Sequence, residues 1–210
     1  LLRPRPYLTD AITQWRIATG RIDVPYTLQY IGTRPVFYQV EQLVRWGFGP
    51  ALGLASLIGL AVGIWHATRE RRVTEAILVV WTIVYSVSTM FAEMKFLRYL
   101  LPLVPPLLVL ASGLPGWLQT VWKHRWAPVA IWGITAAVVV VTAGWAVAFL
   151  SIYTEPNTRV AASAWIDANI PAGATLGVEH WDDPLPLPLP GHPWPGTAYH
   201  QVTLTLYDVR

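Results

Sequence analysis

Four stretches of this chain are long, apolar and free of Asp, Glu, Lys and Arg. A helix rises 1.5 Å per residue and the hydrocarbon core of a bilayer is about 30 Å thick, so about 20 such residues cross it. Charged residues make up only 13% of the 210 residues, roughly half the fraction usual in soluble domains. The sequence therefore predicts a transmembrane region, 46–151, whose four helices cover 46–67, 76–92, 100–122 and 127–151.

The residues before the first span, 1–45, are mixed in polarity and are interrupted by proline and glycine, so they cannot form a span. The spacing of apolar residues predicts one short helix between Asp10 and Gly20 and an amphipathic helical turn from Phe37 to Val44. We expect an external loop whose two short helices lie at the membrane surface.

The residues after the last span, 152–210, have the pattern of a soluble α/β domain. We expect a helix capped by Asn157 or Thr158, followed by strands at TLGVEHW and HQVTLTLYDV. Because the chain starts without Met and stops after a strand-like run, we also expect a piece of a longer protein. The predicted packing face of the helix holds Val160, Ala161, Ala164, Trp165 and Ala168.

The expected fold class is therefore a mainly α membrane protein, with about four transmembrane helices, an external loop bearing short amphipathic helices, and a partial α/β extracytoplasmic tail. Short loops rich in Lys and Arg favour the cytoplasmic side. Two of the predicted loops carry such residues, and they favour an orientation with loop 1–45, the turn before the third span and the tail outside. The count is not decisive, because Arg45, Lys95, Arg98 and Arg159 flank the spans on that opposite side. The basic residues of these two loops are Arg69, Arg71 and Arg72, and then Lys123 and Arg125.

A cationic patch stands at the start of the third span. Lys95 is three residues from Arg98 and four from Tyr99, so the three would share one face of a helical turn. Pro102 has no N–H to give to the carbonyl of Arg98, and the N-terminal end of a helix beginning here would attract an anion. The patch fits a site for a lipid-linked phosphate, and it also fits the alternative that Lys95 and Arg98 reach ordinary lipid headgroups.

Three runs resemble one family: KFLRYLLPLVPP, TLQYIGTRPVFYQVEQLVRWGFGPALG and RVAASAWIDANIPAGATLGVEHWDDPLPL. They are similar to bacterial members of the protein O-mannosyltransferase and aminoarabinose transferase group, glycosyltransferase family 39, over about Tyr26 to Pro186. Those proteins are C-type glycosyltransferases, multi-span enzymes that take a sugar from a polyprenyl-phosphate carrier on the outer face of the membrane. The resemblance implies an enzyme of the bacterial cytoplasmic (inner) membrane and cell envelope, whose partners are that donor, membrane lipids and a protein, lipid or glycan acceptor.

The resemblance also implies roles for particular residues. Lys95, Arg98 and Tyr99 would contact the donor phosphate. The acidic residue that activates the acceptor in this family belongs to the first external loop after the first span, and no residue here matches it, so the catalytic residue is unknown and expected outside this chain. Glu93 is a candidate to orient the cations or bind acceptor, with a plain helix-boundary charge as the alternative. External-loop contacts with substrate are expected from Gln29, Tyr30, Tyr38 and Glu93.

The same residues also bear on other classes of function. A membrane transporter or flippase segment for an anionic or lipid-linked substrate is the main alternative, although such a protein should carry ionisable groups inside its spans. A structural membrane protein without substrate is a third possibility. Nucleic-acid binding is excluded, because the basic residues are scattered among membrane-flanking loops.

No cofactor is assigned, although a divalent metal remains possible for the enzyme. Glu179, His180, Asp182 and Asp183 lie close together in sequence and raise the question of a metal site. Adjacent carboxylates before a proline are more typical of a turn, so the sequence assigns no metal ligands.

Overall fold

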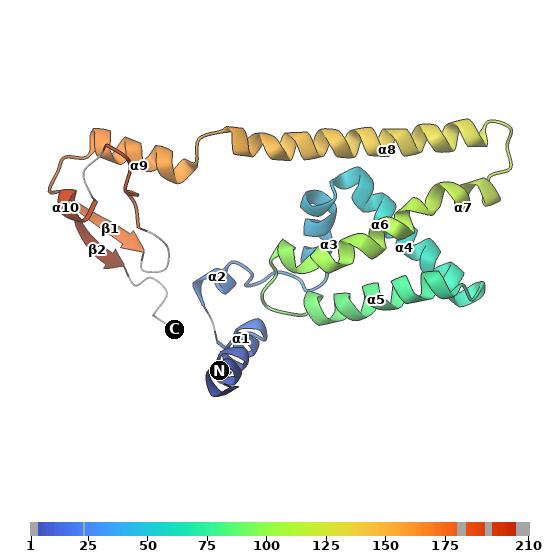
Figure 1. The fold of residues 1–210 in the computed structure, drawn as a ribbon, viewed down its shortest axis with the longest axis horizontal. Coiled ribbons are helices and arrows are strands. Elements are labelled where there is room, and N and C mark those ends of the chain that lie inside the picture. The colour runs from blue at the N-terminus through green and yellow to red at the C-terminus, as the bar shows by residue number, and fades with distance from the viewer. Residues whose placement is uncertain (1–3, 23, 180–183, 192–194, 205–210) are drawn as a thin grey trace. The chain divides into compact units, whose positions relative to one another are not determined.

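The structure is a computed structural model that describes residues 4–22, 24–179, 184–191 and 195–204. The chain divides into two compact units, Leu1–Val147 and Ala148–Arg210. The first unit is helical, and the second combines helices with a two-stranded sheet (Figure 1).

Four helical segments of the described chain are long and apolar enough to span a membrane, and they start at Pro50, Val73, Leu97 and Ala127. This confirms a mainly helical fold with four helical segments long and apolar enough to be the predicted spans. The first one, α4 (Pro50–Arg69), begins four residues later than expected. Gly49 has a φ of 77°, a conformation that suits glycine, and Pro50 then starts the helix because it needs no N–H partner there.

The second span, α5 (Val73–Met90), packs against α4, and a face of small residues lets the third span approach α4 closely. A Cβ atom added to Gly59 would lie 2.7 Å from the backbone nitrogen of Ala111, and one added to Gly63 would lie 2.7 Å from Leu110. Small residues in such positions let helix backbones approach within the membrane, where dispersion contacts replace the hydrophobic driving force.

The third span is not one regular helix, as the sequence had predicted for 100–122. It consists of a 3-10 helix at Leu97–Leu103, α6 (Val104–Ser112) and α7 (Leu114–Val121). Pro102 removes one backbone donor from the first piece, and two side chains of α5 bind its carbonyl groups instead. The Trp81 Nε1–H donates to the Pro102 oxygen at 3.2 Å and the Tyr85 hydroxyl to the Tyr99 oxygen at 2.9 Å.

The fourth span, α8 (Ala127–Leu150), has almost no buried side chains of its own. It contacts the bundle through Trp145, which lies against Gly49 and has its ring 6.1 Å from that of Trp46. Its apolar surface is therefore left to lipid or to other protein.

The loop before α4 holds more helix than expected. Its elements are α1 (Pro4–Ala18), which starts earlier than the predicted Asp10, then α2 (Pro25–Leu28), α3 (Phe37–Gln42) and a π-helical turn at Leu43–Gly47. The π-helical turn joins the main apolar core of the unit, which is made of Leu43, Phe48, Met90, Leu100, Leu103 and Leu107.

The second unit contains a short 3-10 turn, Ser151–Thr154, then α9 (Thr158–Asn169), β1 (Thr175–Glu179), α10 (Pro195–Ala198) and β2 (His200–Leu204). The two strands pair in parallel, with Thr175 opposite His200. A parallel pair needs a crossover connection, as in α/β folds.

The structure corrects the predicted packing face of α9, while the predicted cap Asn157 is confirmed by its side chain, which accepts from the Arg159 N–H at 2.9 Å. Trp165 is 60% exposed and Val160 42% exposed, whereas Ser163 is fully buried. The hydroxyl of Ser163 accepts from the Leu187 N–H at 2.8 Å. The buried face of α9 is therefore the one that the backbone at Leu187 approaches, and not the one with the largest apolar side chains.

Candidate functional site

Five aromatic rings gather around the turn between α5 and the third span. The Tyr30 ring centre lies 5.6 Å from that of Phe96 and 5.9 Å from that of Tyr38, and both pairs meet edge to face. Tyr26 and Tyr99 contact Phe96 from two other positions, at 6.0 and 5.8 Å. We call these rings, with the two cations among them, the Lys95 cluster; its members are Tyr26, Tyr30, Tyr38, Lys95, Phe96, Arg98 and Tyr99.

Lys95 is the buried cation of this cluster. Its side chain is only 3% exposed, and its ammonium lies 3.6 Å from the half-exposed carboxylate of Glu93 and 5.9 Å from the centre of the Tyr30 ring. A buried ammonium needs such partners, because leaving it unpaired in a low-dielectric site is costly. Lys95 is therefore already neutralised within the protein.

Arg98 is the exposed cation of the cluster. Its guanidinium lies over the ring of Phe96 at 4.3 Å and near that of Tyr99 at 5.3 Å. No ion pair joins Arg98 to any other residue within the described part of the chain. A planar guanidinium that lies on aromatic faces can still use the N–H donors in its own plane, which suits an incoming phosphate.

The expectation that Lys95, Arg98 and Tyr99 share one helical face is wrong. Lys95 lies outside any helix, and the 3-10 helix begins only at Leu97, after the extended residue Phe96. The proline-rich sequence that follows cannot supply the donors of a regular α-helix, so the helical start moves past Lys95. The structure still brings the three residues together, but through ring contacts and not through helical spacing.

The predicted loop residues divide into those inside and those outside the cluster. Tyr30 is only 5% exposed, and burial raises its pKa from the usual 10.0 to about 12, with Tyr38 adding to the rise and Arg98 opposing it. Tyr30 therefore remains a neutral phenol at physiological pH. Gln29 is exposed, and its amide donates at 2.9 Å to the backbone carbonyl of Tyr26, so among the described contacts it meets the cluster only through a backbone atom and not through a ring or a cation.

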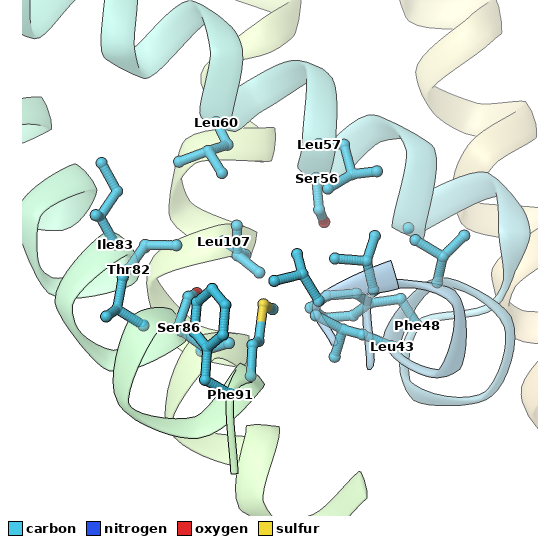
Figure 2. A pocket seen from close by; sticks show the side chains of 17 residues that line it. Leu43, Phe48, Ser56, Leu57, Leu60, Thr82, Ile83, Ser86, Phe91 and Leu107 are labelled. Atoms are coloured by element: carbon cyan, nitrogen blue, oxygen red, sulfur yellow. The ribbon is translucent and has the colours of Figure 1, made fainter. Parts of the chain in front are cut away.

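An apolar cavity of about 270 Å³ lies among α3, α4, α5 and the third span (Figure 2). α3 contributes Val40 to this cavity and Tyr38 to the Lys95 cluster, so the two features share one short helix. Ser56 lies six residues along α4, about 9 Å from the start of that helix, so the cavity extends that far along a candidate span. Cavities of about 150 Å³ hold benzene, so this one can hold a longer section of an apolar chain.

A buried hydroxyl of this cavity has no hydrogen-bond partner among the described residues. Most hydroxyls of the spans donate to their own helix, as Thr82 does to the Leu78 carbonyl at 2.8 Å. Ser56 is 1% exposed, its Oγ atom has no partner, and Figure 2 shows its side chain pointing from α4 into the cavity. Sequence reasoning missed Ser56, although a polar residue among the glycines of α4 is a visible signal.

The backbone of Val36, which lines this cavity, is strained. Val36 has a φ of 66° and a ψ of −57°, and the Phe37 N–H donates to the Pro35 carbonyl at 2.7 Å, which defines a γ-turn. This conformation is rare for a β-branched residue. It is held by the Val36 N–H, which donates to the Met90 carbonyl at 3.3 Å.

Gln39, on the next turn of α3, is a second buried polar residue that the sequence reasoning missed. It is 1% exposed, and its amide nitrogen donates to the Thr89 carbonyl at 3.2 Å, while its amide oxygen has no partner. Its position between Val36 and Leu43, on the apolar side of the helix, was the signal available in the sequence.

A set of ionisable side chains lies at the opposite end of the bundle. His66, at the end of α4, lies 3.8 Å from the Glu70 carboxylate and 3.7 Å from that of Glu75. Arg72 joins the same two carboxylates, one of them at 2.6 Å. These pairs link the ends of α4 and α5 and place ionisable groups at the boundary of the spans.

No group of three or more His, Asp and Glu side chains in the described ranges could hold a metal ion. The sequence-level question about His180, Asp182 and Asp183 concerns residues outside those ranges. The structure therefore adds no metal ligands to the site.

Comparison with known proteins yields no relative. No family model matches the chain, and neither the curated proteins nor the solved structures contain a significant match. What the fold defines is a helical protein with four potential membrane spans and a small α/β unit, and any narrower assignment depends on the site.

Proposed function

We propose that this chain belongs to an integral membrane glycosyltransferase, in which the Lys95 cluster holds the phosphate of a polyprenyl-phosphate sugar donor. The sugar would be transferred to a protein, lipid or glycan acceptor on the outer face of the membrane. The observation that carries the proposal is that α3 joins two features, an apolar cavity lined by Val40 and, through Tyr38, the cluster that holds Arg98, an exposed cation without an ion pair among the described residues. An anionic head joined to an apolar chain is the ligand that fits both features.

The proposed chemistry needs a cation at this position. The acceptor hydroxyl forms a bond to the anomeric carbon, and the bond from that carbon to the phosphate oxygen breaks, so that polyprenyl phosphate leaves with an additional negative charge. Preorganised positive groups that meet developing charge lower the barrier. In the proposal, Arg98 binds the phosphate directly, and Lys95 supports Arg98 from its buried position beside Glu93.

The aromatic rings have a defined part in the proposal. The rings of Phe96 and Tyr99 contact the guanidinium of Arg98 and position it. The neutral phenol of Tyr30 can donate a hydrogen bond without adding negative charge to an anionic site. The base that accepts the acceptor proton is not assigned to any residue here, and we expect it outside this chain.

The test is binding of polyprenyl phosphate to the full-length protein in nanodiscs, together with transfer from a panel of polyprenyl-phosphate sugars. Arg98→Leu should weaken binding at least tenfold and reduce transfer, while Arg98→Lys should retain part of both. The matched control is Arg45→Leu, because the Arg45 guanidinium is already paired with Glu41 at 3.0 Å. If Arg98→Leu binds polyprenyl phosphate as well as the control does, Arg98 does not hold the donor.

The transporter alternative is tested by the same preparation. A flippase would move a labelled polyprenyl phosphate across proteoliposomes without an acceptor, whereas the proposed enzyme releases polyprenyl phosphate only when sugar is transferred. Movement without transfer would reject the enzyme in favour of the transporter.

A further inference from the structure

α1 exposes one continuous apolar face. Its four large apolar side chains are between 48% and 73% exposed. With 3.6 residues per turn, they fall within an arc of about 140° around the helix, and the other side of the helix carries mostly polar residues. The residues of the apolar face are Tyr7, Leu8, Ile12 and Trp15.

The position of α1 is fixed at its C-terminal end. The Glu93 N–H, at the end of α5, donates to the Ala18 carbonyl at 2.9 Å, and Ile17 is buried. Gly20 then turns the chain with a φ of 68°, and the Glu93 side chain occupies the place where a Cβ of residue 20 would stand. The helix is thus anchored at the level where a membrane span ends.

The direction of α1 differs from that of the spans. In Figure 1, α1 runs across the direction of α5 rather than along it. A helix whose C-terminal end is held at the end of a span, and which runs across the direction of that span, lies parallel to the membrane surface when the span crosses the bilayer. This arrangement brings a bilayer surface within reach of an exposed apolar face.

The charges on α1 complement a lipid surface. Arg16 follows Trp15 and is exposed, and the Arg21 guanidinium lies over the Trp15 ring at 4.4 Å. Tryptophan and tyrosine favour the headgroup level, and arginine beside them meets lipid phosphates. Asp10, the acidic residue of α1, lies on the side away from the apolar face.

We propose that α1 rests on the bilayer surface at the Glu93 end of the spans, with Tyr7, Leu8, Ile12 and Trp15 in the lipid and Arg16 and Arg21 on anionic headgroups. The partner is an anionic lipid surface, and the proposal does not depend on any enzymatic activity. Because the Ala18 carbonyl of α1 accepts from the Glu93 N–H, the same helix connects the lipid surface to Glu93, the ion-pair partner of Lys95.

These 210 residues contain no cysteine, so an introduced cysteine is the single one within this sequence; any cysteine elsewhere in the full-length protein is first replaced by serine. Spin labels at Leu8→Cys and Ile12→Cys probe the apolar face, and Thr9→Cys and Thr13→Cys are matched controls on the other side. In nanodiscs with anionic lipid, the first pair should be reached by oxygen more than by a water-soluble nickel chelate, and the second pair should show the reverse. If all four labels are reached mainly by nickel, α1 is in water and the proposal fails; if the first pair is shielded from both reagents, protein covers the face and it also fails.

The choice of anionic lipid has its own test. The label at Ile12→Cys should become several times more accessible to nickel when the anionic lipid is replaced by phosphatidylcholine alone. Adding Arg16→Gln and Arg21→Gln should remove this dependence on lipid charge. Unchanged nickel accessibility on removal of anionic lipid would overturn the assignment of anionic headgroups.

Discussion

The ammonium of Lys95 lies 3.6 Å from the carboxylate of Glu93, and the two side chains differ sharply in exposure, at 3% and 52%. The pair therefore connects the interior of the Lys95 cluster with its surroundings. It also leaves Arg98 as the cation that an external anion meets first.

Glu93→Gln should lower the stability of the protein. The substitution leaves a buried ammonium without its countercharge, and because Glu93 is half exposed, the expected loss is about 1 to 2 kcal/mol, below that of a fully buried pair. Thermal unfolding in detergent measures it. The double variant with Lys95→Met should recover part of the loss, and purely additive effects of the two changes would show that the pair is not coupled.

Gly59→Ala should separate α4 from the third span. The new Cβ would lie 2.7 Å from the Ala111 nitrogen and 2.8 Å from its Cα, and backbone atoms cannot rotate away. Overpacking of this kind costs about 1 to 3 kcal/mol. Gly133→Ala on α8 is the control, because nothing lies within 4 Å of its new Cβ; equal stability of the two variants would argue against the close packing.

Tyr30 should make the stability depend on alkaline pH. Its pKa is raised in the folded protein to about 12, so the folded state holds the phenolic proton more tightly than the unfolded state. The stabilisation is fully present below pH 10 and is lost as pH rises from 10 towards 12, by about 2 to 3 kcal/mol. Unfolding should be followed between pH 9 and about 12, and Tyr30→Phe should flatten the slope; an unchanged slope would place the titration elsewhere.

Tyr85→Phe should weaken the attachment of the third span to α5. The hydroxyl of Tyr85 donates to the Tyr99 carbonyl at 2.9 Å, and its loss leaves a partly buried acceptor unpaired at a cost of about 1 kcal/mol. Hydrogen exchange at 97–103 should rise along with the loss of stability. Tyr153→Phe, at a residue that is 76% exposed, should change neither quantity.

The spans could be predicted from sequence because they depend on one local property, the absence of charge over a sufficient length. The break of the third span was harder to foresee. Pro102 and Gly113 were visible, but whether proline bends a helix or ends it depends on donors such as Trp81, which come from elsewhere in the chain. Helix ends near proline are therefore set by tertiary contacts.

The candidate site was predicted as a set of residues but not as an arrangement. Sequence spacing predicted that Lys95 and Arg98 lie side by side. In the structure Lys95 is buried and Arg98 is exposed, because Tyr30 packs over Lys95 from a loop far away in sequence. Ser56 and Gln39 were missed because each is marked by a buried polar atom without a hydrogen-bond partner among the described residues. That property depends on which distant segments pack around them. Side-chain pairing across distant segments is the part of the site that local patterns do not encode.

In α8, none of the side chains in the most apolar part of the helix is buried within the protein. Partition into lipid alone is then sufficient to hold this helix in place, whether or not α4, α5 and α6 have assembled. Damage to the bundle, such as Gly59→Ala, should leave the sidedness of the C-terminal unit unchanged, so that assembly defects and topology defects can be separated in this chain.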